Sequence, residues 1–248
     1  MARTIIVIPC YNEEKRLDVA RCLQFLNASE RVQLLLVNDG SRDDTLGVLE
    51  RLRHAAPDRI QVLDLHRNGG KAEAVRQGFL EAFKASPDYV GFWDADLATP
   101  LEAIPAFEAL LNERPQLEMV FGARIRLLGR SIERKAARHY LGRVFATAAS
   151  MALGLAIYDT QCGAKLFRAT PLIQSLFETR FLTNWVFDVE ILARFIQARR
   201  SADLPPVETA IYEYPLLQWH DVAGSKIGAL DFPKGAIELL IIYRTYVR

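Results

Sequence analysis

The sequence has 248 residues, of which 50% are hydrophobic and 25% charged, and its formal net charge is +1. This composition excludes a disordered chain, and the near-zero charge disfavours nucleic acid as a partner. Three cysteines, Cys10, Cys22 and Cys162, fit neither a disulfide framework nor a zinc motif, so we expect a reducing, cytoplasmic compartment. The apolar run at 144–157 is too short to cross a bilayer, so we expect no spanning helix.

Apolar, β-branched runs alternate with helix-like segments over the first half of the chain. This alternation predicts an α/β fold, with one domain over 1–248, a mostly parallel central sheet and helices on both faces. Strands are expected at 4–8, 32–37, 60–65, 89–93 and 118–122, with Pro9 ending the first. Helices are expected from Asn12, which has the character of an N-cap, and at 43–53, 71–85 and 101–112.

The second half of the chain is less regular. We expect a long helix at 131–155, a short strand at 165–168, and helices at 185–198 and 233–246. Seven cations lie between Arg124 and Arg143, where Glu133 is the only acid, and apolar residues follow. A basic and then apolar helix favours contact with a membrane surface or with a phosphate-bearing lipid. A solvated basic helix start that then enters the core is the alternative.

Two carboxylates, Asp94 and Asp96, follow the strand at 89–93. Ligands of parallel sheets bind at the carboxyl ends of the strands. Carboxylate oxygens suit Mg²⁺ or Mn²⁺, which are often held by one or two carboxylates together with substrate phosphates. The pattern therefore predicts a metal site, with a solvated Asp-x-Asp turn as the alternative.

The ends of the first two strands carry groups that suit a nucleoside. Tyr11 can stack on a base, while neighbouring carboxyl or amide groups can bond its edge or the ribose. Asp39 is placed to accept a hydrogen bond from a base N–H. The ordinary alternative is that these segments only cap helices, and both interpretations can hold together.

Four segments occur in a fixed order: Pro-Cys-Tyr-Asn-Glu at 9–13, Asn-Asp-Gly-Ser at 38–41, Asn-Gly-Gly-Lys at 68–71 and Asp-Ala-Asp at 94–96. Together they resemble the inverting glycosyltransferases of family 2, which have the GT-A (Rossmann-like) fold. Asp-Thr-Gln-Cys-Gly at 159–163 and Phe-Asp-Val-Glu at 187–190 resemble the polyprenyl- or dolichyl-phosphate branch. The first of these segments, together with Gly-Ser-Lys at 224–226, favours the members that transfer glucose, with mannose next.

The resemblance implies that residues 1–122 bind a nucleotide sugar and residues 123–248 the acceptor. A hexose would pass with inversion from a UDP-sugar, or a GDP-sugar, to a polyprenyl phosphate. Mg²⁺ or Mn²⁺ would be the cofactor, and the protein would contact the cytoplasmic membrane face peripherally. The implied donor site is Pro9, Tyr11, Asn12, Glu13, Asp39, Lys71, Asp94, Ala95 and Lys226, with Asp94 and Asp96 on the metal; the implied catalytic and acceptor residues are Asp96, Asp159, Arg124 and Arg138.

Other functions stay open at this point. An enzyme of the same fold could act on a saccharide or protein hydroxyl, which would need a carboxylate base such as Asp159 or Asp188. A protein could also bind nucleotide sugars without turnover. His220 and Asp221, followed by Gly-Ser-Lys at 224–226, are expected to form a flap over the diphosphate rather than a zinc site. The sequence predicts no oligomeric state.

Overall fold

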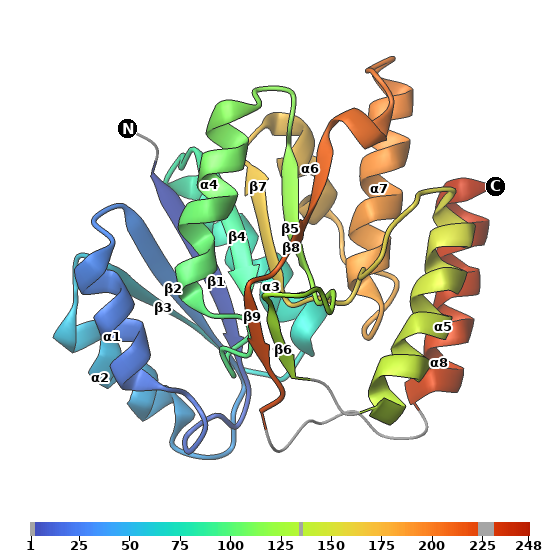
Figure 1. The fold of residues 1–248 in the computed structure, drawn as a ribbon. Coiled ribbons are helices and arrows are strands. Elements are labelled where there is room, and N and C mark those ends of the chain that lie inside the picture. Colours follow the sequence, from blue (N-terminus) through green and yellow to red (C-terminus); the bar gives the residue numbers. More distant parts are fainter. Residues whose placement is uncertain (1–2, 134–135, 223–230) are drawn as a thin grey trace.

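The computed structural model describes residues 3–133, 136–222 and 231–248, and within them all side chains except those of 133–141 and 231–232. Parallel strands alternate with helices, as the sequence pattern predicts (Figure 1). The strands are β1 (Thr4–Cys10), β2 (Val32–Asp39), β3 (Ile60–Leu65), β4 (Tyr89–Trp93), β5 (Met119–Ala123), β6 (Ser131–Glu133), β7 (Ala164–Arg168), β8 (Ile211–Pro215) and β9 (Gln218–His220). The helices are α1 (Val19–Ala28), α2 (Thr45–Ala55), α3 (Lys71–Lys84), η1 (Leu101–Ala103), α4 (Ile104–Glu113), α5 (Ala136–Leu153), α6 (Pro171–Glu178), α7 (Phe187–Ser201), η2 (Val207–Thr209), α8 (Asp231–Ile242) and η3 (Tyr243–Val247).

Among the described residues, the central sheet has seven strands in the order β3-β2-β1-β4-β7-β5-β8. Neighbouring strands are parallel, except that β7 runs antiparallel to both β4 and β5. Strands β6 and β9 pair separately. Because β7 belongs to the second half of the chain and lies beside β4 from the first half, one sheet joins both halves. The functional division at residue 122 stays a prediction.

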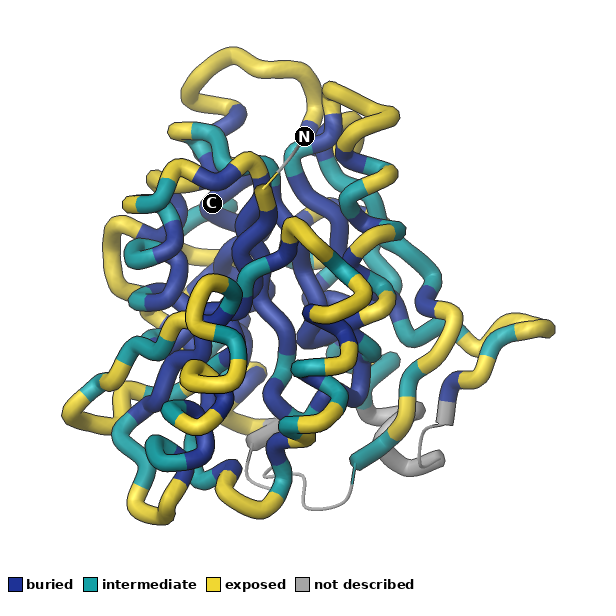
Figure 2. Tube along the Cα trace, turned by 90° about the vertical axis from the view of Figure 1, so that its left-hand side faces the viewer, coloured by how far each residue is buried: buried dark blue, intermediate teal, exposed yellow. Residues whose placement is uncertain are grey.

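Alternate residues of β1 face opposite layers of helices. Ile5 and Val7 pack in a cluster with α3, α6 and α7, whereas Ile6 and Ile8 pack in a cluster with α1, α2 and α4. Figure 2 shows the buried strands in the interior and the exposed turns around them. This arrangement confirms an α/β domain with helices on both faces, and it explains why β1 is apolar at consecutive positions.

Strand β1 continues through Pro9 to Cys10, so the prediction that Pro9 ends it is wrong. The pairing of β1 with β4 stops at Val7, while its pairing with β2 continues to Cys10. Proline lacks a backbone N–H, and a strand tolerates it where one neighbour has already ended.

Asn12 does not cap a helix, contrary to prediction. Its φ of 53° lies in the left-handed region, which asparagine tolerates better than most residues. Helix α1 begins only at Val19, where the Asp18 side chain accepts a hydrogen bond from the Arg21 N–H at 3.0 Å. An irregular segment therefore separates β1 from its helix and leaves room for a ligand-binding loop.

The helix predicted over 131–155 is wrong at its start. Residues 131–133 form β6, which pairs with β9, and α5 begins only at Ala136. The partner strand β9 is distant in sequence, so no local sequence pattern predicts the pairing. For the same reason the sequence did not predict β8 or β9, and it also missed α6. No helix among the described residues combines the length and hydropathy needed to cross a membrane.

Candidate active site

A cleft of about 680 Å³ lies at the carboxyl ends of the strands. It brings together most residues that the sequence predicted for the site. Asn12 is absent from its lining, Lys226 lies outside the described residues, and the side chain of Arg138 lies outside them as well. The predicted residues that line the cleft are Pro9, Tyr11, Glu13, Asp39, Lys71, Asp94, Ala95, Asp96, Arg124 and Asp159.

Hydrogen bonds join the loops that follow β1 and β2. The Asn12 amide oxygen accepts from the Arg42 N–H at 2.9 Å, and the Asn12 N–H donates to Ser41 Oγ at 3.1 Å. The Glu13 N–H donates to Thr45 Oγ1 at 2.8 Å. Asn12 thus supports the loop that carries Tyr11 rather than facing the cleft itself.

Asp39 ties the end of β2 to the start of α3. Its two carboxylate oxygens accept from the N–H groups of Gly69 and Gly70 at 2.7 and 2.9 Å. Burial raises the pKa of Asp39, although these two amides oppose the shift. Gly70, with a φ of 86°, then delivers Lys71 as the first residue of α3.

The turn after β4 carries the two candidate metal ligands. The Asp94 N–H donates to the Gly163 carbonyl at 2.9 Å, and the Asp96 carboxylate accepts from the Ala98 N–H at 3.1 Å. Leu97 has a φ of 49°, a strained conformation for a branched residue, and this tightens the turn. A Cβ at Gly163 would lie 1.9 Å from an Asp94 oxygen, so a larger residue here would have to displace the Asp94 carboxylate.

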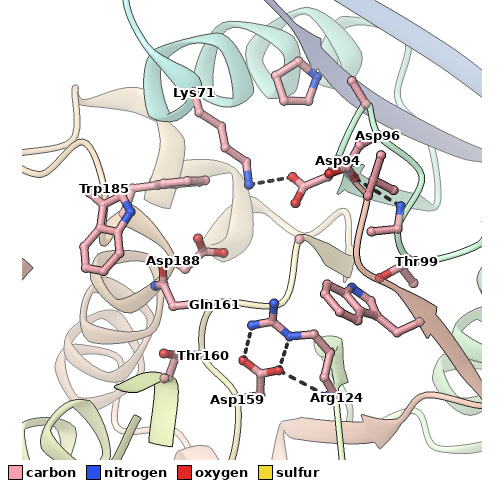
Figure 3. A pocket seen from close by; sticks show the side chains of 18 of the residues that line it. Lys71, Asp94, Asp96, Thr99, Arg124, Asp159, Thr160, Gln161, Trp185 and Asp188 are labelled. Carbon is pink, nitrogen blue, oxygen red and sulfur yellow. Dashed lines mark hydrogen bonds and ion pairs between the residues drawn. The ribbon is translucent and has the colours of Figure 1, made fainter. Parts of the chain in front are cut away.

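Two cations face these carboxylates. Lys71 Nζ lies 2.5 Å from Asp94 Oδ1 (Figure 3), and Arg16 Nη2 lies 3.9 Å from Asp96 Oδ2. Burial by itself would lower the pKa of Lys71, but Asp94 and Asp188 outweigh burial and raise it, so the ammonium stays charged. Burial and the charge of Asp94 raise the pKa of Asp96.

The donors at this turn fit a hard divalent cation. Asp94 and Asp96 are both carboxylates, both line the cleft, and both already attract positive charge. The described residues include no cluster of three or more His, Cys, Asp or Glu side chains suited to a metal. Two carboxylates completed by phosphate oxygens and water are a usual set for Mg²⁺ or Mn²⁺.

Arg124 and Asp159 form a bidentate ion pair in the same cleft (Figure 3). Arg124 Nε and Nη2 donate to the two Asp159 oxygens at 2.6 and 2.7 Å, and the Arg124 N–H adds a third bond at 3.1 Å. Burial alone would lower the pKa of Arg124, but the carboxylate raises it overall. The Asp159 N–H donates to Glu213 at 2.6 Å. Asp159 is thereby held against Arg124.

Several cleft residues were not predicted from the sequence. Arg16 and Trp185 gave no signal beyond ordinary helix and turn residues. Arg143 was seen only as one of a run of cations, yet it lines the cleft and lies over the Tyr158 ring at 3.7 Å. Gln161 stood inside the Asp-Thr-Gln-Cys-Gly segment and could have been singled out there.

The chain is similar to several known proteins. It is 31% identical over 264 residues to a dolichyl-phosphate beta-glucosyltransferase of Saccharomyces cerevisiae, covering 98% of this chain and 74% of that one. The human enzyme of the same name is 31% identical over 238 residues, covering 90% and 68%. Glucosyl-3-phosphoglycerate synthase from Mycobacterium tuberculosis, solved with Mn²⁺, UDP-glucose and phosphoglyceric acid, has the same fold, with a TM-score of 0.68, 18% identity and coverage of 98% and 80%.

The match to a family model agrees with the fold and with the strand-end motifs. The model for glycosyl transferase family 2 covers residues 5–176, which include β1 except its first residue, strands β2 to β7 and the whole Asp94–Asp96 turn. Since that span is more than half of the chain, this protein belongs to glycosyl transferase family 2.

Proposed function

We propose that the chain transfers glucose, with inversion, from UDP-glucose to dolichyl phosphate or a similar polyprenyl phosphate. One observation carries the proposal: a single cleft holds the Asp94–Asp96 carboxylate pair together with Arg124 and Arg143. Carboxylates that bind a metal suit a nucleotide diphosphate, and arginines suit a second, separate phosphate. The dolichyl-phosphate beta-glucosyltransferases of Saccharomyces cerevisiae and human, to which this chain is similar, support the same donor and acceptor classes.

Each part of the donor has a proposed partner in the cleft. The base and ribose lie against Pro9, Tyr11 and Glu13, beside Asp39 and the Ala95 backbone. Lys71 approaches the diphosphate, and Lys226 is assigned there by resemblance alone. Asp94 and Asp96 would hold Mg²⁺ or Mn²⁺, which neutralises the leaving diphosphate when bound. The solved synthase with Mn²⁺ and UDP-glucose supports this cofactor.

The acceptor phosphate takes the opposite end of the cleft. Arg124 and Arg143 orient it, together with Arg138 by resemblance, and Asp159 holds the Arg124 guanidinium in place. A phosphate oxygen forms the bond to the anomeric carbon as the bond to the UDP oxygen breaks, and UDP leaves with the electron pair. Because the phosphate is already an anion, no side chain has to remove a proton.

Peripheral membrane contact is part of the proposal. Val144 and Met151 on α5 are 71% and 79% exposed, and Ile237 and Leu240 on α8 are 62% and 48% exposed. The two helices lie along one edge of the molecule (Figure 1). Exposed apolar helix faces suit an acyl boundary. Ile237→Lys should reduce binding to anionic lipid vesicles. Leu204→Lys changes an exposed residue that is distant in sequence, and it should not reduce this binding. Equal binding by the two variants would refute the membrane contact.

The function is tested with purified protein, Mn²⁺, UDP-glucose and dolichyl phosphate, with the product lipid identified by mass. We expect dolichyl phosphate carrying glucose, together with one UDP for each glucose transferred. Asp96→Asn should lower the transfer rate by at least about 100-fold. Full turnover in that variant would remove the metal assignment. A GDP-mannose arm tests the donor.

The same assay separates the alternatives. An enzyme acting on hydroxyl groups would glucosylate a saccharide but not the lipid, and would depend on Asp188 more than on Arg124. A non-catalytic binding protein would bind UDP and release none from UDP-glucose. Either result would overturn the proposed acceptor.

A further inference from the structure

Three polar side chains form one patch on the cleft wall. Thr160 and Gln161 belong to the segment that precedes β7, and Asp188 lies in the first turn of α7. In Figure 3, Gln161 lies between Asp188 and Arg124, on the far side of the Lys71–Asp94 pair from Asp96. The patch thus separates the proposed diphosphate end of the cleft from the proposed acceptor end.

A buried lysine fixes this patch from behind. Lys165 has no exposed surface, and its ammonium donates to the carbonyl oxygens of Thr160 and Cys162 at 3.1 and 2.7 Å and to the Asp188 carboxylate. An ammonium has three protons, so these three acceptors use its full capacity. The lysine balances the charge of Asp188 and ties the 160–162 segment to α7. The wall is therefore ordered before a ligand arrives.

Two donors in the patch have no partner within the described part of the chain. Gln161 Nε2 and Thr160 Oγ1 are both buried atoms that make no hydrogen bond to a described residue. Leaving buried donors unpaired costs free energy, so such groups in a cleft indicate an acceptor that a ligand supplies. Asp188 adds an acceptor, because only one of its oxygens is engaged by Lys165.

We infer that Gln161, Thr160 and Asp188 recognise hydroxyl groups of the transferred hexose. This inference rests on the proposed function. A sugar hydroxyl both donates and accepts, and the patch offers both kinds of group, whereas an ionised phosphate only accepts and would leave the Asp188 oxygen without a donor. The position agrees, since the sugar must lie between the leaving diphosphate and the incoming phosphate. Gln161 is thus a residue that determines donor specificity.

The test compares UDP with UDP-glucose. Gln161→Met keeps the length of the side chain and removes its amide, and Gln174→Met on the exposed face of α6 is the matched control. In the presence of Mn²⁺ we measure the affinity for each ligand by calorimetry, and kcat and KM for glucose transfer. We expect the variant to bind UDP within about twofold of the unmutated protein and to lose about 10- to 100-fold in kcat/KM for UDP-glucose.

A panel of UDP-glucose, UDP-galactose and UDP-xylose completes the test. Gln161→Met and Thr160→Val should reduce the differences in kcat/KM among these three donors, while Gln174→Met leaves those differences unchanged. If Gln161→Met weakens UDP and UDP-glucose equally, or leaves the preference intact, the inference is wrong although the enzyme is a glucosyltransferase. If the unmutated protein binds UDP-glucose but transfers no glucose, the proposed function fails, and so does the inference.

Discussion

At the scale of single residues, backbone positions decide where the reactive groups lie. Asp94 follows β4, but the space for its carboxylate is provided by Gly163, which precedes β7. Lys71 reaches the same carboxylate from the first turn of α3. A metal site at this turn therefore depends on contacts from three separate segments. Substituting Gly163 and substituting Lys71 should change the affinity for Mn²⁺ in opposite directions.

Gly163→Ala should displace the Asp94 carboxylate, because the added Cβ would lie 1.9 Å from one of its oxygens. We expect weaker Mn²⁺ binding and a loss of about 100-fold in kcat/KM, since small misplacements of reacting groups are that costly. Titration calorimetry with Mn²⁺ and the transfer assay provide the measurements. Thermal unfolding serves as the control for folding, and unchanged Mn²⁺ affinity would contradict the assigned role of Asp94.

Lys71→Met should strengthen Mn²⁺ binding in the absence of nucleotide. The ammonium competes with the metal for Asp94, and its raised pKa keeps it charged, so removing it should tighten Mn²⁺ binding by about three- to tenfold. The same variant should bind UDP more weakly when Mn²⁺ is present. Lys84→Met, at the other end of α3, is the control. Weaker Mn²⁺ binding without nucleotide would mean that Lys71 does not compete.

At the scale of elements, α7 and α8 hold the segment that carries Trp185 into the cleft. Glu190 of α7 accepts from the Leu182 and Thr183 N–H groups at 3.0 and 2.9 Å. Glu238 of α8 accepts from the N–H groups of residues 184, 185 and 186 at 3.2, 3.0 and 3.0 Å. A carboxylate at the N-terminal end of α7 also interacts favourably with the helix dipole.

Glu238→Ala should destabilise the protein and loosen this wall of the cleft. Losing the acceptor of three N–H groups at a helix start should cost about 1–2 kcal/mol, which corresponds to a Tm decrease of about 2–8 °C. KM for the donor should rise because Trp185, which lines the cleft, loses its anchor. Glu208→Ala, an exposed acid of η2, is the matched control for differential scanning calorimetry. Equal Tm values for the two variants would show that Glu238 does not hold the segment.

At the scale of the whole molecule, two layers of helices exclude water from the sheet so fully that polar chemistry is confined to its edge. All three cysteines lie in the described part of the chain, where they form no disulfide and are fully buried. Burial, with a smaller effect of Asp18, raises the pKa of Cys22 to about 12, and burial raises the pKa of Cys162 to about 11. Thiolates are the reactive form, so Cys22 and Cys162 are inert while the fold is intact, and burial shields Cys10.

The native protein should therefore resist thiol reagents at pH 8. A thiol with a pKa of 11 or 12 is protonated at that pH, with a thiolate fraction of about one part in a thousand or less, whereas an unfolded thiol titrates near 8.5. Reaction with DTNB at pH 8 should be negligible without denaturant and should reach three thiols per chain in guanidinium chloride. Rapid reaction of the native protein would place at least one cysteine at the surface.

The order of strands and helices in the first half of the chain, the α/β class and the strand-end carboxylates could all be derived from the sequence, because they depend on neighbouring residues. Apolar runs define β1 to β5, and each leaves its polar residues at the same edge of a parallel sheet. The Asp94–Asp96 pair and Tyr11 were therefore predictable as cleft residues. Asn12 was predicted there too but does not line the cleft, because its left-handed backbone and its bonds join it to the loop after β2.

Only the tertiary structure decided which distant segments meet. The pairing of β6 with β9, the insertion of antiparallel β7 beside β4, and the Arg124–Asp159 and Lys165–Asp188 ion pairs join residues far apart in the chain. Such contacts arise from packing and charge compensation across the whole fold, so local sequence patterns do not predict them. The cations of the cleft were visible in the sequence as charges, but their partners, and hence their roles, were set by folding.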